Sequence, residues 1–444
     1  MKQIQLPDKV KYIISQLETA GYEAYAVGGC VRDSLLGRQP SDWDVTTSAK
    51  PQQVKAVFRH TIDTGIQHGT VTVMLDREGF EVTTYRIDGE YEDSRHPKEV
   101  VFTANLIEDL KRRDFTINAF AYNDRSGIVD AFRGMEDLEN GVIRCVGEAA
   151  ERFGEDALRM LRAVRFSAQL GFSIAEETKA AIRELAPSLR HISAERIQAE
   201  LVKLLMSDNP DYMRDAHELG ITGIVLPELD TAFATAQHNP HHQYTVGEHL
   251  MQSLLHIRAD KSLRIAALLH DIGKPQVRTT DEDGIDHFHG HVEVSEWMAL
   301  DILKRLKFDN DTIDKVQKYV RYHDYKPEPD ARAVRRAANK IGAEYFPQVM
   351  EIWRADILAQ SDYQRSENLA RVCRVGQLYA EIMEKNQCIS LKTLQITGSD
   401  LLALGVPKGK RIGEILNQLL DEVLQNPANN TRGYLLEKAK KIVE

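Results

Sequence analysis

The residue pattern of this chain changes once, close to Gly147, and that change limits the folds open to it. Before it, short runs rich in Val, Thr, Tyr and Phe alternate with helical patterns, as in AYAVGG, HGTVTVML, FEVTTYRI and FTINAFAY. Such runs are typical of strands. After it, apolar residues recur at steps of three and four, as in EDALRMLRAVRFSAQL, which is typical of amphipathic helices. We therefore expect an α+β fold, with a mixed β-sheet and helices first and helices alone afterwards.

Turn signals divide the helical part further. The 444 residues correspond to about three domains at roughly 150 residues each, and Asn-Pro pairs mark turns near Pro210 and Pro240. We expect an N-terminal head, a helical neck and body, a second helical domain and a helical tail, at 1–147, 148–235, 236–370 and 371–444.

Charge and composition exclude several classes of protein. Lys plus Arg is 57 and Asp plus Glu is 67, so the net charge is 57 − 67 = −10, which disfavours general attraction to nucleic acid but is compatible with a local basic cleft. No run approaches the ~18 apolar residues of a spanning helix. The first residues lack an apolar signal core, and the four cysteines form no CxxC pair. We expect a cytoplasmic protein without membrane contact.

The first candidate site follows the run AYAVGG. Gly28 and Gly29 let a ligand approach the backbone, and a helix that begins there offers free N–H groups to phosphate. Arg32, one turn later, adds a charged donor. By themselves, two glycines before a helix more often form only a tight turn.

Two carboxylates follow in Asp42-Trp43-Asp44, directly before the strand-like Val45-Thr46-Thr47. Residues two apart on a strand share a face. Paired carboxylates of this kind hold one or two Mg²⁺ ions, which keep positions open for substrate phosphates. An acidic turn is the alternative reading.

These features together resemble the head domain of the nucleotidyltransferase superfamily, and in particular class II tRNA nucleotidyltransferases (CCA-adding enzymes) and bacterial poly(A) polymerases. Further segments continue the resemblance in order: RRDFTINA at 112–119, FRGMEDL at 132–138, IRCVG at 143–147 and EDALR at 155–159. The resemblance implies that Asp42 and Asp44 are catalytic and hold Mg²⁺. It also implies attack of a tRNA 3′-hydroxyl on the α-phosphate of CTP or ATP, with release of pyrophosphate.

The resemblance also implies nucleotide-binding residues beyond the glycines and Arg32. Asp156 and Arg159 lie three apart, so they share a helical face, and a carboxylate with a guanidinium can read the edge of a base. In the family this pair stands in for a nucleic-acid template. We expect triphosphate or tRNA-end contacts from Arg113, Arg162 and Arg165, although a solvated helix face explains the last two equally well. Glu81 is a further carboxylate whose direction the alternation leaves open.

The exact product stays open at this point. The polar segment Arg86 to Phe102 resembles the flexible loop that the family needs for AMP addition, which favours CCA or A-only addition over CC-only addition. The mildly basic end NTRGYLLEKAKKIVE favours tRNA over poly(A) synthesis. The tail hairpin with Lys408, Lys410 and Arg411 is either a phosphate-binding or a packing element.

A second constellation lies in the helical part and resembles the HD phosphohydrolase family. Its core signature is matched by four residues, and two more histidines resemble extra ligands of binuclear members: His249, His270, Asp271 and Asp356, then His291 and His323. Imidazole and carboxylate sets suit Mn, Ni, Fe, Co or Zn. The resemblance implies a phosphohydrolase acting on 2′,3′-cyclic phosphate or other phosphoesters, or else a degenerate spacer. The partners expected are the tRNA end with its acceptor and T arms, CTP and ATP; a monomer and a homodimer both stay open.

Overall fold

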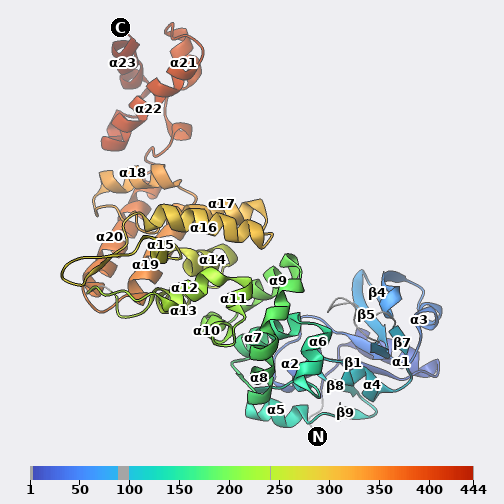
Figure 1. Cartoon of the computed structure of the whole chain (residues 1–444). Coiled ribbons are helices and arrows are strands. Elements are labelled where there is room, and N and C mark those ends of the chain that lie inside the picture. The colour runs from blue at the N-terminus through green and yellow to red at the C-terminus, as the bar shows by residue number, and fades with distance from the viewer. Residues whose placement is uncertain (1–3, 89–99, 241, 444) are drawn as a thin grey trace. The chain divides into compact units, whose positions relative to one another are not determined.

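The computed structural model describes residues 4–88, 100–240 and 242–443, and the chain divides into two compact units, Met1–Pro227 and Glu228–Glu444. The four predicted domains and the three boundaries between them stay predictions. The α+β class is confirmed: strands concentrate in the first unit and helices dominate the rest (Figure 1). No described helix combines the length and apolar character that crossing a membrane requires.

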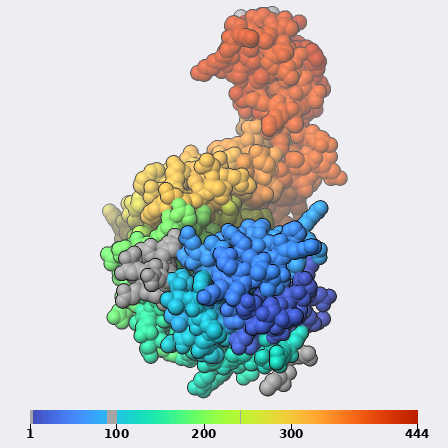
Figure 2. Space-filling view, turned by 90° about the vertical axis from the view of Figure 1, so that its right-hand side faces the viewer, coloured from blue at the N-terminus to red at the C-terminus, as the bar shows by residue number. Residues whose placement is uncertain are grey.

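The first unit is built on a seven-stranded sheet with the order β3-β4-β5-β2-β1-β8-β9. Only β2 and β5 pair in parallel; the other neighbours are antiparallel. The strands are β1 (Ala24–Val27), β2 (Val45–Thr47), β3 (Thr61–Gly65), β4 (Thr70–Leu75), β5 (Glu78–Thr84), β8 (Phe120–Asn123) and β9 (Gly127–Asp130). Residues of β3, β4 and β5 form much of the blue surface that faces the viewer in Figure 2.

Helices surround this sheet and continue into the rest of the first unit. They are α1 (Asp8–Thr19), α2 (Gly29–Leu35), α3 (Pro51–Val57), α4 (Leu106–Lys111), α5 (Gly134–Asn140), α6 (Ala149–Glu155), α7 (Leu158–Leu170), α8 (Glu176–Leu185), α9 (Ala194–Leu205), α10 (Met213–Glu218) and α11 (Thr222–Val225). A short parallel pair, β10 (Val142–Ile143) and β11 (Ser173–Ile174), joins the end of the head to the helices that follow.

The segment predicted as a flexible loop is described only at its ends. There β6 (Arg86–Asp88) and β7 (Val100–Phe102) pair antiparallel, with Arg86 opposite Phe102. The rest of that prediction, residues 89–99, lies outside the described part of the chain.

Over residues 228–240 and 242–443, the second unit is helical apart from one small hairpin, β12 (Thr279–Thr280) with β13 (Asp286–His287). Its helices are α12 (Pro227–Ala234), α13 (Val246–Leu255), α14 (Lys261–Leu269), α15 (Lys274–Val277), α16 (His291–Arg305), α17 (Asn310–Tyr322), α18 (Ala331–Ile341), α19 (Phe346–Ala359), α20 (Arg365–Glu384), α21 (Gly398–Ala403), α22 (Lys410–Gln425) and α23 (Arg432–Val443). The last three pack on one another (Figure 1), and the predicted tail cations Lys408, Lys410 and Arg411 are exposed there.

Candidate functional sites

The two glycines form a sharp junction between β1 and α2. Gly28 precedes the helix with φ 83°, a conformation that L side chains rarely adopt. A Cβ at this position would come within 2.9 Å of Arg113 Nη1. The junction therefore needs glycine for two reasons, its backbone angle and the guanidinium packed against it.

The predicted carboxylates lie beside this junction, at the start of β2. Val45 of β2 is in register with Val82 of the parallel strand β5. Asp44 precedes Val45 and Glu81 precedes Val82, so these two acidic residues are neighbours across the sheet. Desolvation, together with repulsion from Asp42 and Glu81, raises the pKa of Asp44 to about 6, against attraction from Arg113. Asp44 still keeps part of its surface exposed. Crowded carboxylates that remain open to solvent are the donors a hard divalent cation prefers.

Arg113 is held by a buried acid that the sequence did not single out. Asp109 is fully buried and its carboxylate lies 3.7 Å from Arg113 Nη2 and 2.7 Å from Arg112 Nη2. Burial opposes ionisation of Asp109, but the two arginines outweigh it and lower its pKa. The guanidinium of Arg113 is thus fixed close to both Gly28 and Asp44. Arg32, by contrast, is buried and donates to Asn118 Oδ1 at 2.6 Å.

The expected base-reading pair does not share a helix. Asp156 ends α6 with extended backbone angles, and its Oδ1 accepts a hydrogen bond from Leu158 N at 3.1 Å, at the start of α7. Arg159 lies inside α7, where its Nη1 contacts Glu155. The assumption of one helical face is therefore wrong, because the chain kinks between the two helices. The pair stays adjacent nevertheless, since Arg159 N donates to Asp156 O at 3.0 Å.

Arg196 is a contact that sequence reasoning missed. It reaches from α9 and holds the Asp156 carboxylate through two hydrogen bonds, at 3.2 and 2.7 Å. Forty residues separate the two in the sequence, and AERIQAEL reads as an ordinary amphipathic helix. No local pattern could have identified this arginine.

The two later arginines of α7 pair with buried acids, although Arg162 itself keeps 32% of its side chain exposed. Arg162 donates to Asp114 Oδ2 at 2.9 and 2.6 Å; burial opposes ionisation of Asp114, but Arg162 and Asn118 outweigh it and lower its pKa to about 2. Arg165 is 6% exposed, donates to buried Glu200 at 2.7 Å and lies 3.5 Å from the ring centre of Phe166. A nucleotide-binding role for Arg165 stays a prediction, and its surroundings favour a packing role.

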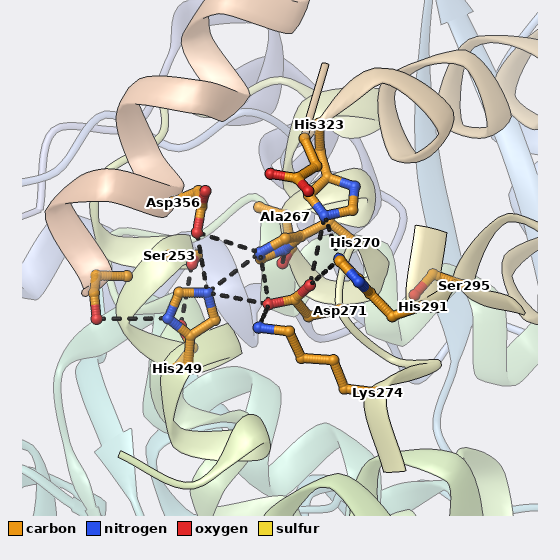
Figure 3. A network of polar contacts seen from close by, with 12 residues as sticks. His249, Ser253, Ala267, His270, Asp271, Lys274, His291, Ser295, His323 and Asp356 are labelled. Atoms are coloured by element: carbon orange, nitrogen blue, oxygen red, sulfur yellow. Dashed lines mark hydrogen bonds and ion pairs between the residues drawn. The ribbon is translucent and has the colours of Figure 1, made fainter. Parts of the chain in front are cut away.

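The second unit brings all six predicted ligand residues together (Figure 3). They come from five helices: α13, the end of α14, the start of α16, the end of α17, and α19. Asp271 lies between two sets of ligand atoms, each set within 4.8 Å: one with His249, His270 and Asp356, the other with His291 and His323. Five of the six residues are buried, all except half-buried His291.

Backbone carbonyls orient all four imidazoles the same way. The Nδ1 atoms of His249, His270, His291 and His323 lie 3.4, 2.9, 2.9 and 2.7 Å from the carbonyl oxygens of Ala359, Ala267, Phe288 and Val320. Each Nδ1 therefore carries its proton and donates it to a carbonyl, which leaves the Nε2 lone pair facing the centre. In this orientation each histidine can bind a metal through Nε2 while its Nδ1–H is held by a carbonyl.

The facing nitrogens fit a cation between them. Two pairs of Nε2 atoms lie 3.2 Å apart, His249 with His270 and His291 with His323. Two neutral imidazoles with Nδ1–H tautomers cannot hydrogen-bond through Nε2, since both atoms are acceptors. Asp271 Oδ1 lies 3.4 Å from the Nε2 atoms of His291 and His323 but has no hydrogen-bond partner among the described residues. These donors suit a transition metal.

Two lysines neutralise the buried carboxylates of Asp271 and Asp356. Neither lysine was identified as a site residue from the sequence. Lys274 Nζ lies 2.6 Å from Asp271 Oδ2, and Lys326 Nζ lies 2.8 Å from Asp356 Oδ2. Burial opposes ionisation of both acids, yet these cations bring their pKa values well below the usual range. Lys274 follows the HD pair within one turn and could have been noticed; Lys326 could not, because thirty residues separate it from Asp356.

A third missed residue, His242, lines the hollow that Asp271, His291, His323 and Asp356 border. His242 packs edge-on against His249, with ring centres 5.3 Å apart. Burial and the nearby charge of Lys274 lower the pKa of His242 to about 3, so its ring is neutral near pH 7.

Comparison with known families divides the chain in the same order. Residues 24–144 match the "Poly A polymerase head domain", and residues 171–233 match a domain described as an RNA and SrmB binding site of polymerase A. Residues 278–439 match a model described as tRNA nucleotidyltransferase domain 2.

Similar proteins and structures carry one description. The CCA-adding enzyme of Limosilactobacillus reuteri is 36% identical over 450 residues, which cover both chains completely. That of Leuconostoc mesenteroides is 52% identical over 209 residues, 46% of this chain; the match spans about half of that relative, 52% of its length. The crystal structure of the Bacillus stearothermophilus CCA-adding enzyme in complex with CTP superimposes with a TM-score of 0.74 and 30% identity, covering 99% of each chain.

Proposed function

Because this chain belongs to the family of CCA-adding enzymes, which are nucleotidyltransferases, we propose that it adds C, C and A to tRNA 3′ ends. The substrates would be CTP, ATP and tRNA, with pyrophosphate released at each step. The full-length match to relatives that carry this description is the observation that supports CCA addition over A-only or poly(A) synthesis. Such a substrate also suits a cytoplasmic enzyme.

The carboxylates beside Gly28 would hold the divalent metal on which the family depends. We assign this role to Asp42 and Asp44 and choose Mg²⁺, with Glu81 as a neighbouring charge. Bound Mg²⁺ supplies charge neutralisation at the reacting phosphates. Arg113, fixed by Asp109, is placed to attract the triphosphate, and the Gly28–Gly29 junction lets phosphates approach the backbone.

Base selection would fall to Asp156 and Arg159. Both side chains already have protein partners, Arg196 and Glu155. These contacts hold the carboxylate and the guanidinium in place at the kink between α6 and α7. A pre-oriented pair loses little rotamer freedom when a base arrives, which favours selective binding.

Extension of labelled tRNA ending at the discriminator base tests this function. With CTP, ATP and Mg²⁺ we expect addition of C, C and A, and then a stop. A single A added only to tRNA ending in CC would show an A-adding enzyme, and long A-tails would show a poly(A) polymerase. Asp42→Ala should abolish all incorporation.

We propose a second, phosphohydrolase function for the six-ligand centre. The observation that favours it is the convergence of four Nε2 atoms on Asp271, with each Nδ1 held by a carbonyl. Hydrolysis of a 2′,3′-cyclic phosphate would join a water oxygen to phosphorus and break one P–O bond to the ribose, whose oxygen then takes a proton.

Metal analysis of purified protein tests this second function. We expect a transition metal in the native chain and none in the His270→Ala/Asp271→Ala double variant. The double variant should also lose phosphatase activity while it extends tRNA normally. Equal, negligible metal in both proteins would show a degenerate helical spacer.

A further inference from the structure

A cavity lies next to the six-ligand centre and has no part in the functions above. It lies along α19 and α20 and has a volume of about 180 Å³, room for roughly six waters at about 30 Å³ each. It is therefore more than a packing defect between two helices.

The walls of this cavity are apolar on one side and polar on the other. Half-buried Val372 forms the accessible apolar part, and Trp353, Ile357 and Val375, which are 0%, 2% and 2% exposed, form the floor beneath it. Asn368 lies on the polar part, and its side-chain amide makes no hydrogen bond to any residue that the structure describes. An apolar slot with a free amide, which offers both donors and an acceptor, suits a flat heterocycle with a polar edge.

The cavity is joined to the metal ligand Asp356 by two side chains. Gln360 Nε2 donates to Asp356 Oδ1 at 2.9 Å, and Lys326 Nζ lies 2.8 Å from Asp356 Oδ2. Both side chains line the cavity, and Gln360 also borders the hollow formed by Asp271, His291 and His323. A ligand in the cavity therefore lies just behind the six-ligand centre.

We propose that this cavity binds the base of the terminal nucleoside of an RNA whose 3′ phosphate is presented to the six-ligand centre. This inference rests on the proposed phosphohydrolase function and deepens it, because it makes the site selective for nucleotides over other phosphoesters. Val372 contacts the face of the base above the buried floor that holds Trp353, and Asn368 contacts its polar edge. Lys326 stands between the base and the phosphate, where a cation attracts the anionic linkage.

The chain carries a natural reporter for this test. It has three tryptophans, Trp43, Trp297 and Trp353, and only Trp353 lines the cavity. In the Trp43→Phe/Trp297→Phe variant, fluorescence reports on the cavity alone, even though AMP can also occupy the nucleotidyltransferase head. Titration in EDTA makes the result independent of any bound metal.

We expect AMP to change the Trp353 emission saturably, and ribose 5-phosphate, which lacks a base, to bind at least tenfold more weakly. Val372→Phe fills the cavity and should weaken AMP binding at least tenfold. Ala370→Phe, on an exposed position of the same helix, is the matched control and should not. Asn368→Ala should weaken AMP binding about threefold to tenfold. Normal tRNA extension by each α20 substitution, made in the chain that keeps Trp43, shows that the variant folds.

A second set of assays tests the base site separately from the phosphohydrolase function. It also tests whether the ligand is an RNA end or a free nucleotide. With metal, Val372→Phe should raise the KM for 2′,3′-cyclic AMP and for RNA ending in a cyclic phosphate about tenfold, and leave hydrolysis of bis(p-nitrophenyl) phosphate unchanged. AMP binding without any hydrolysis would refute the phosphohydrolase and keep the base site. Hydrolysis without AMP binding, or binding unaffected by Val372→Phe, would overturn the base site alone. Hydrolysis of 2′,3′-cyclic AMP but not of RNA ending in a cyclic phosphate would overturn the proposal that the ligand is an RNA end.

Discussion

Arg196 holds the carboxylate of Asp156 through both of its terminal nitrogens, although the two residues lie on different helices. The carboxylate is partly exposed, with 17% of its side-chain surface accessible, so it is restrained and still open to a ligand. The restraint comes from α9, outside the motif that carries Asp156.

Replacing Arg196 should impair base recognition without preventing folding. A hydrogen bond to a charged group contributes roughly 1.5–3 kcal/mol, so Arg196→Ala should lower kcat/KM for CTP and ATP by about 10- to 100-fold. Steady-state tRNA extension measures this. Arg183 is an exposed arginine on α8, and Arg183→Ala should keep the wild-type kcat/KM. An unchanged kcat/KM in Arg196→Ala would show that Asp156 does not need Arg196 to hold it in place.

Arg165 should contribute to stability and not to nucleotide affinity. Its ion pair with Glu200 is buried, at 7% and 5% side-chain exposure, and breaking a buried pair costs about 3–5 kcal/mol. Arg165→Met should lower the free energy of unfolding by that order while the KM for CTP stays the same. Arg165→Met/Glu200→Gln should recover part of the loss. A large rise in KM at unchanged stability would instead support triphosphate binding.

Asp44→Asn should stabilise the metal-free protein and abolish its activity. The pKa of Asp44 is raised to about 6. Above pH 6 Asp44 is therefore ionised in both the folded and the unfolded chain, but only in the folded protein does this charge lie in unfavourable surroundings. Removing that charge should raise Tm at pH 8 in EDTA, and the gain should fade as the pH falls from about 6 towards 4. Thermal melts across this range measure it. A gain that is independent of pH would contradict the crowding of Asp44 by Asp42 and Glu81.

Lys274 and a bound metal should substitute for each other in part. Lys274 is 6% exposed and neutralises Asp271 at 2.6 Å. Lys274→Met should therefore destabilise the metal-free protein strongly, by about 3–5 kcal/mol. Added Mn²⁺ or Ni²⁺ should restore much of the Tm, because the cation then neutralises the same carboxylate. Equal losses with and without metal would argue against a metal at Asp271.

The sequence located the candidate site residues on the elements observed where these residues come in short motifs, and their roles stay predictions. The Gly28–Gly29 turn, the carboxylates before β2 and the His270–Asp271 pair at the end of α14 all follow from local spacing. It was misleading at Asp156 and Arg159, because a three-residue spacing implies one helix only when no kink intervenes. Here the chain leaves α6 and begins α7 between them.

By itself, then, the sequence determined the α+β class, the order of the motifs and the residue types of both candidate sites, since helix and strand periods report on neighbours a few positions apart. The tertiary structure decided which charges meet. Arg196 with Asp156, Arg165 with Glu200 and Lys326 with Asp356 are separated by 40, 35 and 30 residues. Such pairs depend on how whole helices pack, and the burial that makes each pair strong exists only once they have packed.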